Sequence, residues 1–185
     1  MSDQPEAATA TATRVWLLAS IAVLVLVADI VTKTIAVAQL EGQEPVPILG
    51  GLIYLQLLRN PGAAFSMATG FTWILTVIAI AVVFVIIRVA RKLRSTGWAV
   101  ALGLVLGGAL GNLTDRIFRA PGPLQGHVVD MVSPFAPNGE AFAVFNLADS
   151  AITCGGVLLV LLALLGRELD GSRAGPKAGK EPAGE

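Results

Sequence analysis

The chain has 185 residues, of which 55% are hydrophobic and only 14% charged, and its mean hydropathy is +0.74. This composition excludes an ordinary soluble domain and indicates a membrane protein. Its 13 basic and 13 acidic residues balance, so net charge gives no argument for a nucleic-acid partner, and the single Cys154 allows neither an internal disulfide nor a cysteine-based metal cluster.

The first long apolar stretch, Val15 to Ala38, is long enough to cross a bilayer as a helix, which takes about 20 residues. It contains Asp29 and Lys33, which lie four residues apart on one helix face and favour a structural ion pair. A cleavable signal peptide is the alternative, because Arg14 precedes the apolar run and Ala36-Val37-Ala38 resembles a cleavage site. The two charges argue for a retained first span.

The connection that follows, residues 39–70, contains a β-prone stretch from Pro47 to Leu58 with turn residues on both sides. It predicts short strands on the membrane surface. The connection continues as Asn60-Pro61-Gly62-Ala63-Ala64-Phe65-Ser66, in which Asn-Pro-Gly favours a tight turn and the two alanines allow a chain to approach closely. Taken alone, this segment predicts only a turn.

The second and third spans are predicted at Phe71 to Ile87 and Trp98 to Phe118. The third span ends in Asn112, Asp115 and Arg116, for which an Asp115–Arg116 pair and a contact with substrate are both open. Glycines recur every four residues along this span and predict close approach by a neighbouring helix. They are Gly103, Gly107 and Gly111.

The second outer connection, residues 119–147, contains four prolines and three glycines and cannot form one long helix. We expect an interfacial loop or helix there, whose apolar residues would lie beside the spans as a lid or a surface element. Asp130 lies in this connection, within Gly126-His127-Val128-Val129-Asp130-Met131. On its own, a loop aspartate is typical of a solvated surface position.

The fourth span is predicted from Ala148 to Leu165 and begins at Asp149. Asp149 alone is compatible with a helix cap or an interfacial charge. Asn146, three residues earlier, could cap the same helix or orient the Asp149 carboxylate. Cys154 is expected to be a small packing residue. The termini, residues 1–13 and 167–185, have no apolar face and are predicted to be disordered tails around one membrane domain, residues 14–166.

Basic residues precede the first span, lie between the second and third, and follow the fourth. The positive-inside rule therefore predicts cytoplasmic termini and two outer connections. This topology brings nearly every unusual polar group to the outer leaflet. They are Asp29, Asn60, Asn112, Asp115, Arg116, His127, Asp130 and Asp149.

Two neighbouring carboxylates suit peptide hydrolysis, because one keeps a proton while the other stays charged. The charged member takes a proton from attacking water, and the protonated member hydrogen-bonds the scissile carbonyl oxygen, so no metal or cofactor is required. A proton-coupled transporter using Asp29, Asp115 and Asp149 is a rival, although a relay needs carboxylates through the membrane thickness. A noncatalytic membrane scaffold is another alternative function. A cysteine protease using His127 and Cys154 is disfavoured, and so is a zinc site.

Five motifs taken together resemble the lipoprotein signal peptidases, or signal peptidase II, a family of intramembrane aspartic proteases. Each is weak alone, but they occur in the family's order within its four-span layout. They are Asp29-Ile30-Val31-Thr32-Lys33, Asn60-Pro61-Gly62-Ala63-Ala64-Phe65-Ser66, Gly111-Asn112-Leu113-Thr114-Asp115-Arg116, Val128-Val129-Asp130 and Phe145-Asn146-Leu147-Ala148-Asp149.

The resemblance implies that Asp130 and Asp149 form the catalytic dyad of a monomeric enzyme in the bacterial plasma membrane. It implies that the substrate is a diacylglyceryl-modified prolipoprotein, cut on the N-terminal side of its lipidated cysteine, and that globomycin binds the same cleft. The implied substrate-binding residues are Asn60, Asn112, Arg116 and Asn146, supported by Asp29, Lys33 and Asp115. Met131, where the family often has an aromatic residue, and the Pro/Gly-rich residues 119–125 depart from the pattern and affect the expected lid geometry.

Overall fold

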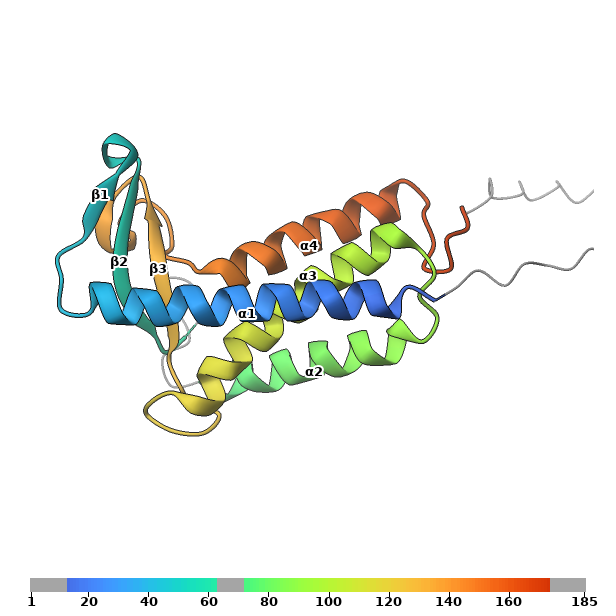
Figure 1. Cartoon of the computed structure of the whole chain (residues 1–185), viewed down its shortest axis with the longest axis horizontal. Coiled ribbons are helices and arrows are strands. Elements are labelled where there is room, and N and C mark those ends of the chain that lie inside the picture. Colours follow the sequence, from blue (N-terminus) through green and yellow to red (C-terminus); the bar gives the residue numbers. More distant parts are fainter. Residues whose placement is uncertain (1–12, 63–71, 174–185) are drawn as a thin grey trace, which may run out of the picture.

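The computed structural model describes residues 13–62 and 72–173 and contains four long helices with a small sheet at one end of the bundle (Figure 1). The helices are α1 (Val15–Leu40), α2 (Thr72–Ala90), α3 (Thr96–Phe118) and α4 (Leu147–Leu164). All four are long and apolar enough to cross a membrane. The predicted spans are therefore confirmed to within a few residues at each end, and the chain is a multi-pass membrane protein.

Helix α3 lies at the centre of the bundle and packs against α1, α2 and α4 (Figure 1). Its glycines allow this, because a Cβ at Gly103 would lie 2.9 Å from the Cβ of Ile21, and one at Gly107 would lie 2.6 Å from that of Val25. The predicted glycine face thus packs on α1. Gly108 allows a second close approach, because a Cβ added there would lie 2.4 Å from the carbonyl oxygen of Ala148 on α4.

The sheet is antiparallel with strand order β1–β2–β3. Strands β1 (Val46–Ile48) and β2 (Ile53–Asn60) overlap the stretch predicted to form strands and extend past it by one residue at the start and two at the end. Strand β3 (Val128–Pro134) pairs with β2, with Leu58 opposite Asp130 and Asn60 opposite Val128. Residues 63–66 of the Asn-Pro-Gly segment lie outside the described residues.

The expectation that Asp130 lies in a solvated loop is wrong, because Asp130 lies on β3 and is only 1% exposed. The strand forms because Val128, Val129 and Met131 are β-prone or apolar and bury on both faces of the small sheet. After β3, the described chain makes a single short 3-10 turn at Pro137–Gly139 and then returns to pair Phe145 with Val132. The outer connection is thus a loop with a strand, without a longer helix in residues 119–146.

Two segments differ from their predicted environment. Residues 167–173, assigned to the C-terminal tail, are held to the bundle: the amides of Arg94 and Ser95 donate to the carbonyl of Leu169 at 2.9 and 3.0 Å. Leu169 also packs against the apolar core. Cys154 is exposed on the surface of α4 and does not pack inside the bundle.

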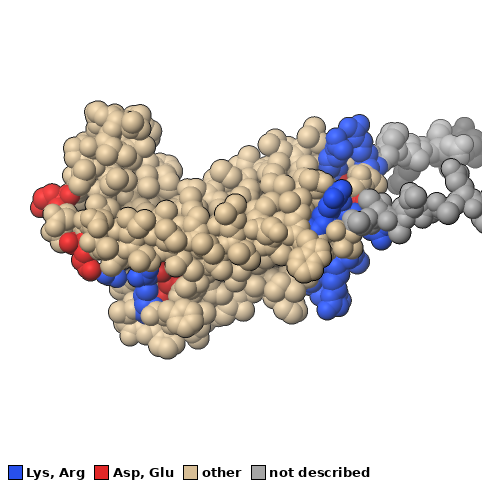
Figure 2. All heavy atoms as spheres, viewed as in Figure 1, with Lys and Arg blue, Asp and Glu red and all other residues tan. Residues whose placement is uncertain are grey.

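Charge is distributed unevenly along the long axis of the molecule (Figure 2). Lysine and arginine gather where the two termini leave the bundle, and the opposite end carries the sheet and most visible acidic side chains. Between them the surface lacks visible charge. Large apolar side chains such as Leu24, Phe84 and Val160 are exposed there, as expected for a lipid-facing surface.

Candidate active site

Asp130 and Asp149 line one cavity of about 460 Å³ enclosed by α2, α3, α4 and the outer loops. Its wall along α2 is apolar and includes Leu75, Ile78 and Val82. Polar residues occupy the end nearest the sheet, where β2, β3, α3 and α4 converge. They are Asn60, Asn112, Arg116, Asp130 and Asp149. The cavity therefore combines an apolar chamber with a concentrated polar end.

The Asp130 carboxylate accepts one hydrogen bond on each oxygen. The side-chain amide of Asn60 donates to Oδ2 at 2.9 Å, and that of Asn146 donates to Oδ1 at 2.7 Å. Burial above all, together with the negative charge of Asp149, raises the pKa of Asp130 from 3.8 to about 7, and this net rise includes the opposing effects of the two amide donors and Lys33. Asp130 therefore holds a proton more readily than an ordinary carboxyl group.

Asp149 lies in the first turn of α4 and is half-buried. Its Oδ2 accepts from the backbone N–H of Asn146 at 3.2 Å, and its own N–H donates to Oδ1 of Asn146 at 2.9 Å, which forms a capping box. Its Oδ1 accepts from the side-chain amide of Asn112 at 2.8 Å. Asn146 therefore both caps α4 and orients the Asp149 carboxylate, two roles that the sequence left as alternatives.

Donor-only groups fix the orientation of the three asparagine amides. The Asn112 oxygen accepts from the Lys33 ammonium at 3.0 Å, and the Asn60 oxygen accepts from the backbone N–H of Gly62 at 3.0 Å. The Asn146 oxygen accepts from the backbone N–H of Asp149. Because neither an ammonium nor a peptide N–H accepts a hydrogen bond, each amide must turn its NH₂ group toward a carboxylate of the pair.

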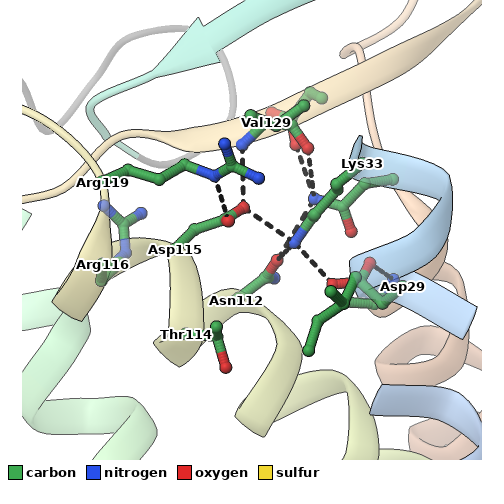
Figure 3. A network of polar contacts seen from close by, with 12 residues as sticks. Asp29, Lys33, Asn112, Thr114, Asp115, Arg116, Arg119 and Val129 are labelled. Atoms are coloured by element: carbon green, nitrogen blue, oxygen red, sulfur yellow. Dashed lines mark hydrogen bonds and ion pairs between the residues drawn. The ribbon is translucent and has the colours of Figure 1, made fainter. Parts of the chain in front are cut away.

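Lys33 is the centre of a buried ionic cluster beside the carboxylate pair (Figure 3). Its ammonium lies 2.7 Å from Oδ2 of Asp29 and 3.0 Å from Oδ2 of Asp115, so the predicted Asp29–Lys33 ion pair is confirmed. Asp29 also accepts from the backbone N–H of Ala148 at 2.9 Å, which ties α1 to the start of α4. Asp115 accepts from the N–H of Val129 at 3.1 Å, directly before Asp130 in β3.

Asp115 pairs with Lys33 and Arg119, and the described ion pairs do not include the Asp115–Arg116 pair, one of the two alternatives that the sequence left open. Adjacent residues point to different helix faces, whereas residue i+4 shares a face. Arg116 is buried and its Nη1 donates to the carbonyls of Pro61 at 3.4 Å and Gly126 at 3.3 Å. It therefore joins the two outer connections at the cavity wall.

Sequence reasoning did not single out Arg119, although its spacing from Asp115 was a usable signal. It also missed Thr72, whose hydroxyl donates to the carbonyl of Pro61, and Thr76, which donates to that of Leu124 at 2.8 Å. These two bonds join α2 to both outer connections, and no local sequence pattern indicates them. Among residues 13–62 and 72–173, no cluster of three or more His, Cys, Asp or Glu side chains has the arrangement of a metal site.

The fold and the site define a multi-pass membrane protein with two neighbouring carboxylates at the polar end of one cavity. Comparison with known families extends this description, because residues 21–165 match the family model described as Signal peptidase (SPase) II. The chain belongs to the signal peptidase II family and is therefore a protease.

Similar proteins cover most of the chain. A lipoprotein signal peptidase of Rhodococcus jostii is 57% identical over 159 residues, which are 86% of this chain and 78% of that protein. One of Mycobacterium tuberculosis is 52% identical over 157 residues, 85% of this chain and 75% of that protein. A solved bacterial membrane enzyme at 28% identity superimposes with a TM-score of 0.71 over 86% of this chain and 99% of its own.

Proposed function

We propose that the chain is an aspartic endopeptidase that removes the signal peptide from diacylglyceryl-modified prolipoproteins, cutting on the N-terminal side of the lipidated cysteine. The observation that carries the proposal is the pair formed by Asp130 and Asp149 at the polar end of the cavity. Three fixed amides direct their donors at these two carboxylates. Lipoprotein signal peptidases similar over most of the chain support the substrate class.

The reaction uses one proton held by the pair. Water attacks the scissile carbonyl carbon, one water proton passes to the ionised aspartate, and the protonated aspartate gives its proton to the carbonyl oxygen, which yields a gem-diol. The C–N bond then breaks as the first aspartate returns its proton to the leaving nitrogen. One gem-diol hydroxyl gives its proton to the second aspartate, which restores the resting pair and releases an acid and an amine.

The cavity suits a lipid-bearing substrate. Its apolar wall along α2 accommodates acyl chains, while the polar end receives the peptide bond and places Asn60, Asn112, Asn146 and Arg116 against substrate. We expect globomycin-type cyclic peptides to occupy the same cavity. No cofactor is required, and we expect the enzyme to act as a monomer.

The charge distribution supports an orientation in the bacterial plasma membrane with both termini in the cytoplasm and the site at the outer face. Basic residues gather at the end where the termini emerge, opposite the sheet (Figure 2). The lipidated cysteine of the substrate would lie at the same membrane surface as the pair. The transporter alternative is weakened because Asp29 and Asp115 are held in ion pairs at the same end as Asp149.

The test is cleavage of a purified diacylglyceryl-modified prolipoprotein by the full-length protein in lipid, followed by gel shift. Wild type should cut, whereas Asp130→Asn and Asp149→Asn should each lose activity and keep the fold, as measured by thermal unfolding. The matched control is Asp170→Asn, an exposed aspartate outside the cavity, which should cut like wild type. Continued cleavage by both dyad variants would show that the assigned pair is wrong.

A further inference from the structure

We propose that the chain from Lys33 through Asn112 makes the two aspartates unequal. Asp149 is the ionised member that takes the proton from water, Asp130 carries the shared proton and donates to the carbonyl oxygen, and Lys33 is a positioning residue. This inference rests on the proposed aspartic mechanism and assigns its two roles.

The first step is that every hydrogen-bond donor of the Lys33 ammonium has a partner. Its ammonium has three N–H groups, and three oxygens surround it within 3.0 Å: those of Asp29, Asp115 and Asn112 (Figure 3). The side chain is only 1% exposed, so water does not compete for these donors. Two of the three partners are carboxylates that fix the ammonium in place, and the third is the only neutral one.

The second step is the orientation of the Asn112 side-chain amide. The Lys33 ammonium holds the amide oxygen, and the same oxygen accepts from Asn146 at 3.2 Å, so the NH₂ group is turned to Oδ1 of Asp149. An amide whose oxygen accepts from a cation is polarised and becomes a stronger donor. Asp149 therefore receives a hydrogen bond strengthened by a charge that does not touch it.

The third step is the contrast between the two carboxylates. Asp149 is half-buried and accepts a backbone N–H at the N-terminus of α4, where the helix dipole favours negative charge. Asp130 is almost fully buried on β3, and its two described donors are the side-chain amides of Asn60 and Asn146. The raised pKa of Asp130 agrees with this difference. Ionised Asp149 and protonated Asp130 are the state that these surroundings stabilise.

Other charged groups act on the pair more evenly. Arg116 of α3 lines the same cavity and attracts both carboxylates, and α2 contributes only apolar side chains to it. Asp29 and Asp115 lie behind Lys33 and are neutralised by it and by Arg119. The Lys33 charge itself also attracts Asp130 and favours the ionised form of that carboxyl group, so the proposed asymmetry depends on the hydrogen-bonded chain and not on the overall charge.

The experiment is a set of pH profiles of kcat/KM for cleavage of a synthetic diacylglyceryl lipopeptide by the full-length protein in lipid. The acid limb of such a profile reports the group that must be ionised, and the alkaline limb reports the group that must be protonated. The main variant combines Lys33→Met with Asp29→Asn, which removes one charge of each sign and leaves the net charge unchanged. Asn112→Ala is measured alone and in combination with it.

We expect the acid limb to move upward by about one pH unit in the charge-matched variant, because Asp149 loses its strengthened donor, while the alkaline limb moves less. The kcat should fall more than KM changes. Asn112→Ala should produce a similar shift, and the combined variant should shift no further than Asn112→Ala alone, since both changes break one chain. Lys33→Arg keeps the charge and a donor and should restore most of the profile.

Additive shifts in the combined variant, or equal movement of both limbs, would overturn the role of the chain. Movement of the alkaline limb alone would reverse the two roles. If the charge-matched variant fails to fold, as judged by thermal unfolding, Asn112→Ala carries the test because it removes no charge, and an unmoved acid limb would then refute the proposal. Failure of the dyad itself is recognised separately, by cleavage that survives in Asp130→Asn and Asp149→Asn.

Discussion

Gly108 lies where α3 meets the first turn of α4, and Gly108→Ala tests whether helix spacing sets the carboxylate pair. A Cβ at residue 108 would lie 2.4 Å from the carbonyl oxygen of Ala148 and 2.8 Å from Cγ1 of Ile152. Carbon and oxygen in close contact lie about 3.3 Å apart. Because a backbone oxygen cannot move by changing rotamer, the two helices must separate locally by about 1 Å.

This displacement falls on the residue before Asp149 and should carry Asp149 away from Asn112 and Asp130. A misplacement of about 1 Å in a reacting group costs about 100-fold in rate. The steric cost of about 1 to 3 kcal/mol is partly offset by the higher helix propensity of alanine, about 1 kcal/mol. We therefore expect kcat to fall about 100-fold with only a small drop in the thermal unfolding midpoint.

The assay is lipopeptide cleavage by the full-length variant in lipid, with thermal unfolding measured on the same samples. Gly156→Ala is the matched control, because a Cβ at that position of α4 meets no atom within 4 Å. It should keep wild-type activity. A folded Gly108→Ala protein that cleaves at the wild-type rate would refute the idea that this contact sets the pair.

Three further outcomes are expected. Because the pKa of Asp130 is raised from 3.8 to about 7, the folded protein holds a proton that the unfolded chain releases, so the unfolding free energy of wild type should fall as pH rises through this range. Thermal unfolding of Asp130→Asn should lack this pH-dependent loss, and parallel curves for the two proteins would contradict the assignment. Arg116→Lys keeps the charge but loses the planar guanidinium, whose Nη1 group bonds two carbonyls, so steady-state kinetics should show a KM about 10-fold higher with kcat less affected. An unchanged KM would show that Arg116 does not contribute to substrate binding. Leu169→Ala should lower the free energy of unfolding by about 1 to 2 kcal/mol, as measured by thermal unfolding, because Leu169 packs against the apolar core. The control Glu168→Ala changes the exposed neighbouring residue and should leave stability unchanged. Equal effects of the two changes would exclude a packing role for Leu169.

Local spacing predicted those parts of the site that lie on single helices. Asp29 and Lys33 are four residues apart, and that spacing alone indicated their ion pair. The same rule would have assigned Arg119 to Asp115, but adjacency in sequence suggested Arg116. The glycine repeat identified the face of α3 that packs on α1, because those glycines share one face; Gly108 lies outside that repeat and packs on α4.

Long-range pairing could not be predicted in the same way. Asn60 and Asp130 are 70 residues apart and meet because β2 pairs with β3, a register fixed by tertiary packing. A short, buried strand with an aspartate at its third position resembles a loop when read alone. The motif resemblance compensated for this limit, since it placed Asp130 and Asp149 in one site without any knowledge of the sheet.

A charge count shows why the buried cluster needs a single proton on the carboxylate pair. Four carboxylates and three cations meet at this end of the bundle; they are Asp29, Asp115, Asp130, Asp149, Lys33, Arg116 and Arg119. With every group ionised, four negative charges against three positive ones leave a net charge of −1, whereas one proton on the pair makes the cluster neutral. A neutral cluster costs least where water is scarce. The three cations therefore stabilise the singly protonated pair, which is the state that the proposed hydrolysis requires.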